Sequence, residues 1–239
     1  MDSAALPSLS NLYEGIDQWV ELAPLLPVLI TLEIVLSADN AIALAAITRK
    51  LKNVDLQSRS LNIGIAIALV FRIVLILLAS LVIDFWPIQL LAGLYLLWLF
   101  VQKLIENSQN LKSNKTESNS NSTFLLTVVT IAFTDLAFSL DSVATAVAIS
   151  DQVLLVITGG IIGVVALRFT AGLFIKWLEE FPRLEIAGYI AVGLVGIKLI
   201  ISLIIKDLYL SEWYILSIVF ILFIWGFSKR QDSTNINNF

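Results

Sequence analysis

Seven long apolar runs divide this 239-residue chain and limit the folds that it can adopt. They lie at about residues 25–47, 62–83, 86–104, 124–149, 153–175, 184–205 and 212–227. A helix needs about 20 apolar residues to cross a bilayer, and these runs are continuously apolar, whereas membrane β-strands are short and alternate. The sequence therefore predicts an all-α membrane protein with seven transmembrane helices.

Composition narrows the class of function. Hydrophobic residues make up 58% of the chain and charged residues 14%, whereas charged residues average about 25% in soluble domains. Seven spans leave no length for a soluble catalytic domain, and the net charge of −4 gives no reason to expect a nucleic-acid partner. Histidine and cysteine are both absent, which excludes imidazole bases, thiol chemistry and soft-metal sites. We expect neither an enzyme nor a permanently bound cofactor.

The first half of the chain is repeated in the second. The run 33–43 (EIVLSADNAIA) matches 135–145 (DLAFSLDSVAT), and the matches continue in order through three spans. The pairs further on are Gly64 with Gly160, Arg72 with Arg168, and Lys103 with Lys198. Three spans is an odd number, so the second copy must enter the membrane in the opposite orientation. The sequence thus predicts two inverted three-helix repeats plus one extra helix, an architecture of many secondary transporters.

These repeats set the domain boundaries. We predict an extracytoplasmic tail at 1–24, a first repeat at 25–105, a second at 124–205, a seventh helix at 206–228 and a cytoplasmic tail at 229–239. Between the repeats, ten of the eighteen residues at 106–123 are Asn or Ser. A segment of this composition cannot bury enough apolar surface to order itself, so we predict a disordered cytoplasmic linker there.

The basic residues predict the orientation. Eleven of the 15 follow the first, third, fifth or seventh span, whereas the connections on the other side hold only Lys206. Cytoplasmic loops are rich in Lys and Arg, so the N-terminus is expected outside the cytoplasm and the C-terminus inside it.

Charged residues inside the spans are the candidates for function. The acids are Glu33, Asp39, Asp135 and Asp141, and the bases are Arg72, Arg168 and Lys198. A charge at the bilayer centre costs about 3 kcal/mol on insertion scales, so four acids within the spans indicate a polar path. Alternatively, the acids only pair with the three bases as internal structural links. Both interpretations hold together if the bases balance the acids when no cation is bound.

Helical geometry divides the acids into two groups. Glu33, Ser37 and Asn40 share one helix face, as their counterparts Asp135, Ser139 and Ser142 do. Asp39 and Asp141 lie about 120° away from these faces in a regular helix. Either each helix has two functional faces, or it is locally unwound at the motif, because the residues 37–40 are weak helix formers.

The type of ligand predicts the type of ion. Carboxylate, amide and hydroxyl oxygens suit hard cations such as Mn(II), Mg(II) and Ca(II). We therefore expect Glu33, Asp39, Asp135 and Asp141 to hold a transported divalent metal ion. The expected neutral ligands are Ser37, Asn40, Ser139 and Ser142, and the expected charge-balancing residues are Arg72, Arg168 and Lys198. Metal ions and protons compete for the same oxygens, which offers a route to proton antiport.

The two motifs, residues 33–41 and 134–144, resemble those of the TerC family of integral membrane proteins. The resemblance extends over roughly 25–225 and implies a manganese exporter with wider kinship to the LysE-type exporter superfamily. On this chain it implies metal contacts from Glu33, Asp39, Asn40, Asp135 and Asp141. Some plant members resemble thylakoid assembly factors, so the resemblance fits either a plasma membrane or a thylakoid membrane.

Two other functions stay open at this stage. The protein could export a cationic amino acid or another small organic solute, as the LysE kinship allows. It could also be an assembly factor for membrane proteins that transports nothing. The sequence leaves the oligomeric state, including a homo-oligomer, undecided.

Overall fold

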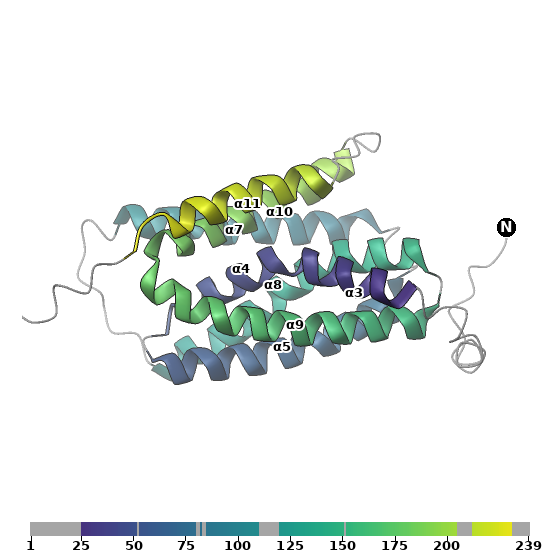
Figure 1. Ribbon diagram of the computed structural model, residues 1–239, viewed down its shortest axis with the longest axis horizontal. Helices are drawn as coiled ribbons and strands as arrows, with labels where there is room; N and C mark the ends of the chain where they lie inside the picture. Colours follow the sequence, from purple (N-terminus) through teal and green to yellow (C-terminus); the bar gives the residue numbers. More distant parts are fainter. Residues whose placement is uncertain are drawn as a thin grey trace, which may run out of the picture.

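The computed structural model describes residues 25–51, 53–79, 82, 85–109, 120–150, 152–204 and 212–230. Every element of regular structure in these ranges is a helix. In chain order they are α3 (Leu25–Leu36), α4 (Ala38–Thr48), α5 (Val54–Leu77), α7 (Trp86–Gln109), α8 (Ser120–Ile149), α9 (Val153–Glu180), α10 (Pro182–Ile204) and α11 (Glu212–Phe227). Figure 1 shows the long helices lying side by side, with consecutive ones running in opposite directions. The prediction of an all-α fold is confirmed for this part of the chain.

Five of these helices are long and apolar enough to cross a membrane. They cover Val54–Leu77, Trp86–Glu106, Thr123–Ile149, Val153–Glu180 and Pro182–Ile204, which correspond to the second to sixth predicted spans. The first predicted span is divided between α3 and α4, and α11 is a shorter helix of 16 residues. The predicted tail 1–24 and residues 205–211 and 231–239 lie outside the described residues.

The first span is interrupted at Ser37, inside the repeated motif. Ser37 still has right-handed helical backbone angles (φ −94°, ψ −6°), and its carbonyl oxygen accepts a hydrogen bond from the Ala41 amide at 2.9 Å. The chain is therefore kinked here without being unwound, and the Ser37 carbonyl stays within the helical hydrogen-bond pattern. The matching segment of the second half is part of the continuous helix α8.

Several helices extend beyond the predicted spans. α5 begins at Val54 because the Asn53 side chain caps its first turn by accepting a hydrogen bond from the Asp55 amide at 2.8 Å. α7 continues to Gln109 and α8 begins at Ser120, so helix occupies both ends of the predicted linker 106–123. Apolar runs mark the part of a helix that lies in lipid, and polar turns can continue it into water. The middle of the linker, 110–119, lies outside the described residues.

The two halves pack against each other along three main helix pairs: α4 with α9, α5 with α8, and α7 with α10. Glycines allow the closest approaches. A Cβ atom on Gly93 of α7 would lie 3.1 Å from the Gly196 carbonyl oxygen of α10, and one on Gly64 of α5 would lie 2.5 Å from Ile131 of α8. Side chains at these positions would force the helix pairs apart.

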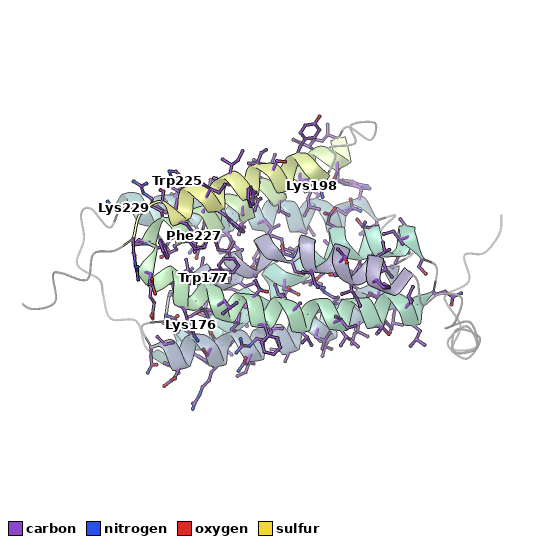
Figure 2. The ribbon with its side chains drawn as sticks, in the orientation of Figure 1. Lys176, Trp177, Lys198, Trp225, Phe227 and Lys229 are labelled. Atoms are coloured by element: carbon purple, nitrogen blue, oxygen red, sulfur yellow. The ribbon has the colours of Figure 1, made fainter. Side chains whose placement is uncertain are left out.

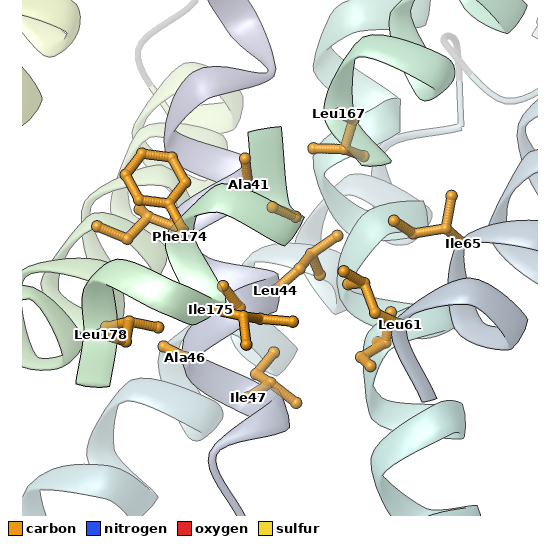
Figure 3. Packing of buried hydrophobic residues seen from close by; sticks show 14 of the residues in the cluster. Ala41, Leu44, Ala46, Ile47, Leu61, Ile65, Leu167, Phe174, Ile175 and Leu178 are labelled. Atoms are coloured by element: carbon orange, nitrogen blue, oxygen red, sulfur yellow. The ribbon is translucent and has the colours of Figure 1, made fainter. Parts of the chain in front are cut away.

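α4 is the most enclosed helix in its C-terminal half. Residues 41–47 are all buried, and Leu44 and Ile47 pack with Leu61 of α5 and Ile175 of α9 in the largest apolar cluster, which Figure 3 shows from close by. This cluster fills the bundle between its interior and the end at which α4 is followed by α5. We call this end of the bundle the basic end, because Arg49, Lys103, Lys176, Arg183 and Lys229 all lie toward it.

Aromatic rings join α11 to the bundle at the basic end. Phe227 contacts Trp177 and Phe181, at ring-centre distances of 5.5 and 5.2 Å, and Phe223 contacts Phe174 at 5.8 Å. Figure 2 shows Trp177, Trp225 and Phe227 gathered there, whereas Lys198 lies toward the opposite end. α11 therefore packs on the outside of the bundle, mainly against α10.

Candidate functional site

A buried arginine lies at the centre of the repeated motifs. Arg72 of α5, with a side chain only 1% exposed, forms an ion pair with Glu33 of α3 (Nη1 to Oε2, 3.1 Å) and one with Asp135 of α8 (Nη2 to Oδ2, 3.6 Å). Its Nε donates a hydrogen bond to Ser139 Oγ at 2.9 Å. The first acid of each sequence copy therefore meets the same guanidinium group. We call these four residues the Arg72 cluster.

Local helix geometry holds the cluster together. Asp135 and Ser139 lie one turn apart on α8, and the Ser139 hydroxyl donates to the Asp135 carbonyl oxygen at 2.7 Å while it accepts from Arg72. α9 closes over Glu33 at Gly163, where an added Cβ atom would lie 2.9 Å from the Glu33 Cβ and 3.0 Å from its Oε2. Glycine at this position leaves the space that the Glu33 side chain occupies.

The charges and hydrogen bonds of the Arg72 cluster are unbalanced. Two carboxylates share one guanidinium group, which leaves one surplus negative charge when all three groups are ionised. Asp135 Oδ1 and Arg72 Nη2 are both buried, and neither has a hydrogen-bond partner among the described residues. Buried polar atoms nearly always have partners, and those that do not call for an explanation such as an ion site. The cluster can thus offer a carboxylate oxygen to a cation.

The second acid of the α8 motif lies in a different environment. Asp141 pairs with Lys198 of α10 (Oδ2 to Nζ, 2.5 Å), and its side chain is 29% exposed. By contrast, the carboxylates of the Arg72 cluster are almost wholly enclosed. The structure therefore divides the predicted ligand set into a buried group around Arg72 and a half-buried pair.

The other predicted ligands lie in the two motifs but outside the Arg72 cluster. Asn40 is buried on α4, and Ser142 is buried on α8, where its hydroxyl lies 3.4 Å from the Ser139 carbonyl oxygen. Ser37 is buried at the kink, and its hydroxyl does not cap α4. Asp39 lies on α4, but its side chain falls outside the described part of the structure. Among the side chains that are described, no three acids gather as a ready metal-ligand group.

Arg168 was predicted to balance charge as the counterpart of Arg72, yet its surroundings differ. Its Nε donates to the Asn62 side chain on α5, and this hydrogen bond is exposed. No ion pair joins Arg168 to an acid within the described ranges. Of the two matching arginines, only Arg72 enters the described cluster.

Sequence reasoning missed a second charged group, at the basic end. Glu185 of α10 pairs with Lys103 of α7 at 2.7 Å and with Arg49, just after α4, at 3.3 Å. Arg49 also donates to the Leu178 carbonyl oxygen of α9 at 3.0 Å. The repeat offered a signal, because Lys103 matches Lys198, and a lysine that both copies place near a helix end is expected to have an acidic partner.

Comparisons with known proteins place the chain in a family. The model of the integral membrane protein TerC family matches residues 17–233. Two membrane proteins of Bacillus subtilis (strain 168), described as uncharacterized, are each 33% identical: YkoY over 217 residues, or 83% of this chain and 67% of its own, and YceF over 176 residues, or 72% and 68%. The UPF0053 inner membrane protein YgdQ of Escherichia coli (strain K12) is 29% identical over 221 residues, which covers 86% of this chain and 88% of its own.

No solved structure matches the chain. The likeness therefore rests on sequence, and it covers all the helices of the described bundle. Together with the five spanning helices, it shows that this is an integral, multi-pass membrane protein, and the chain belongs to the integral membrane protein TerC family.

Proposed function

We propose that this protein is a transporter that exports a hard divalent cation, Mn(II) in the first place, from the cytoplasm. The observation that carries the proposal is the meeting of Glu33 and Asp135 on Arg72 inside the bundle. Each acid comes from a different half of the chain, so a relative motion of the halves would change the distance between them. A cation held by both would thus be sensitive to that motion.

Arg72 acts in this proposal as an internal counter-ion. Removing charges from water is expensive, and a guanidinium group between two carboxylates lowers the free energy of the cluster when no metal ion is bound. The contact with Asp135 is the weaker of the two, because its 3.6 Å separation is too long for a hydrogen bond. An entering cation would therefore bind Asp135 first and then displace Arg72 from Glu33.

Neutral oxygens and a further acid would complete the coordination. Ser139 and Asn40 are buried on the two helices that carry the motifs, and Asp39 lies one residue before Asn40. Asp141 could join the ion only after its pair with Lys198 opens. Such an oxygen-only set suits Mn(II) and Mg(II) better than zinc or copper, which usually recruit the His and Cys that this chain lacks.

The helix contacts support inverted repeats and alternating access. If the two halves exchange roles, the pair α4 with α9 becomes the pair α8 with α5, and the pair α7 with α10 maps onto itself. All three are principal contacts of the bundle, as a two-fold axis in the membrane plane requires. We infer seven spans, with α3 and α4 together forming the first and α11 the last. The basic end then faces the cytoplasm.

Transport in sealed inside-out vesicles tests the proposal. We expect saturable Mn(II) uptake that lysine does not inhibit, and a loss of about tenfold or more in apparent affinity for Asp135→Asn and for Asp39→Asn. Glu179→Gln, which changes an exposed acid on the same scaffold, is the matched control and should transport normally. Proton movement measured in the same vesicles would reveal antiport.

Two results would contradict the proposal. Competition by lysine would favour export of a cationic organic solute. Full function of the Asn variants in cells, with no manganese uptake in vesicles, would favour an assembly factor, because isosteric amides preserve shape while they remove charge.

A further inference from the structure

Two lysines at matching positions of the repeats each close an ion pair between helices. Lys103 of α7 pairs with Glu185 of α10, and Lys198 of α10 pairs with Asp141 of α8. α7 and α10 pack on each other and run in opposite directions, so the two lysines lie toward opposite ends of the bundle. The Arg72 cluster lies deeper than either pair, because its side chains are almost wholly enclosed while the lysine pairs are partly exposed.

The pair at the basic end is the larger of the two. Glu185 accepts from both Lys103 and Arg49, and Arg49 also binds the Leu178 carbonyl oxygen, so this group joins α4, α7, α9 and α10. Lys103 lies over the Tyr189 ring as well, 5.2 Å from its centre. The buried apolar cluster lies nearer to the basic end than Arg72 does, since Leu61 and Ile65 precede Arg72 on α5, which begins at that end. The path from the basic end is therefore closed by charge and by a thick apolar layer.

The ion pair at the other end joins Lys198 of α10 to Asp141 of α8. Asp141 follows Asp135 by six residues on α8, which is about 9 Å along a helix. A small pocket adjoins it at this end of the bundle, between α5, α7 and α8. The pocket is lined by Leu75, Ala79, Val82, Gln89, Leu140 and Val143. Buried apolar residues, among them Leu29 of α3, Leu75 of α5 and Val156 of α9, also lie between the Arg72 cluster and this end. This side is therefore closed by an apolar layer together with the ion pair of Lys198 and Asp141.

We propose that these two ion pairs are the gates of the transporter: Lys103 with Glu185 and Arg49 on the cytoplasmic side, and Lys198 with Asp141 on the opposite side. This inference rests on the proposed function, since gates matter only to a carrier. Asp141 then opens and closes the path, in addition to any contact that it makes with the cation. The described conformation is closed on both sides, because buried apolar residues and an ion pair lie between the Arg72 cluster and each end of the bundle.

Site-directed thiol labelling tests the gates without any transported ion. The chain has no cysteine, so Ser139→Cys introduces a single reporter thiol between the two gates. A membrane-impermeant maleimide is applied to one side of sealed vesicles of known orientation. We expect Lys103→Met to raise the labelling rate from the cytoplasmic side about tenfold, and Lys198→Met to do the same from the opposite side. Lys176→Met, at an exposed lysine, should change neither rate.

Conservative variants distinguish an opened gate from a misfolded bundle. Lys103→Arg and Lys198→Arg keep the charge and should leave both rates near those of the parent, whereas a collapsed bundle would label from both sides in every variant. If both Met variants raised the labelling rate equally from the same side, or if neither changed it, the proposal that the two ion pairs are gates would be wrong. Manganese uptake is measured in the same lysine variants with Ser139 retained, because Ser139 is itself a proposed ligand. Uptake that persists in that case would leave the proposed function standing. One-sided labelling without any manganese uptake would retain the gates and reject manganese as the cargo.

Discussion

The two copies of the repeated motif adopt different structures although they match in sequence. In the second half the motif lies on one unbroken helix, α8, whereas in the first half it spans the kink at Ser37 between α3 and α4. Their first acids, Asp135 and Glu33, nevertheless reach the same guanidinium group. The motif therefore fixes where the charges meet, while the surrounding helices decide how the backbone carries them there.

The matching arginines provide the strongest test of this difference. Arg72→Met should destabilise the protein by about 3–5 kcal/mol, because it leaves two buried carboxylates without a cation. Arg168→Met removes only an exposed hydrogen bond to Asn62 and should cost less than about 1 kcal/mol. Unfolding in mixed detergent micelles, followed by the fluorescence of the six tryptophans, measures both changes. Equal losses would mean that the two halves use their arginines alike.

Replacing each of the matching serines, Ser139 and Ser37, by alanine should change the unfolding free energy in opposite directions. Ser139→Ala removes the acceptor of the Arg72 Nε hydrogen bond and leaves a buried charged donor unsatisfied. Hydrogen bonds to charged groups are worth about 1.5–3 kcal/mol, so the unfolding free energy should fall by about that amount. The same micelle unfolding assay applies. An unchanged free energy would show that water or another residue replaces the hydroxyl.

Ser37→Ala should have the smallest effect and the opposite direction. Ser37 sits at the kink without capping α4, and alanine is the better helix former by about 0.5 kcal/mol. We expect a slight gain in unfolding free energy. A loss as large as that of Ser139→Ala would mean that the Ser37 hydroxyl has a structural bond comparable to the one between Ser139 and Arg72.

The sequence predicted the helical class and five of the seven proposed spans, and the four residues of the Arg72 cluster were among its candidate site residues. The length of the apolar runs and the free-energy cost of a charge in lipid outweigh the helix propensities of single residues. The spans and the charged candidate residues can therefore be predicted without a structure. The sequence could not predict the kink at Ser37. Ser-Ala-Asp-Asn at 37–40 is only a weak helix former, and the matching segment Ser-Leu-Asp-Ser at 139–142 stays helical. Propensity differences of a few tenths of a kcal/mol yield to tertiary packing.

Side-chain partners were harder to predict than positions. Helical periodicity placed Asp141 on a different face from Asp135, and the structure gives it a different partner, Lys198. Nothing in the sequence distinguished Arg72 from Arg168, because both lie at the same place in their repeats. Which of them enters the core depends on how α5 and α9 rotate against their neighbours, and that is a property of the whole bundle. Glu185 was missed although the match of Lys103 with Lys198 indicated an acidic partner for each lysine.

The single buried arginine makes the two orientations of the proposed carrier unequal. A carrier built from two identical halves would rest facing either side of the membrane with equal probability. Here the guanidinium group that meets both first acids belongs to one half, and its counterpart Arg168 lies elsewhere, so exchanging the roles of the halves does not restore the same electrostatic energy. The resting protein should then favour one face, so the two orientations of the proposed carrier would be unequally populated before any ion binds, while the direction of net transport would still follow the ion gradients.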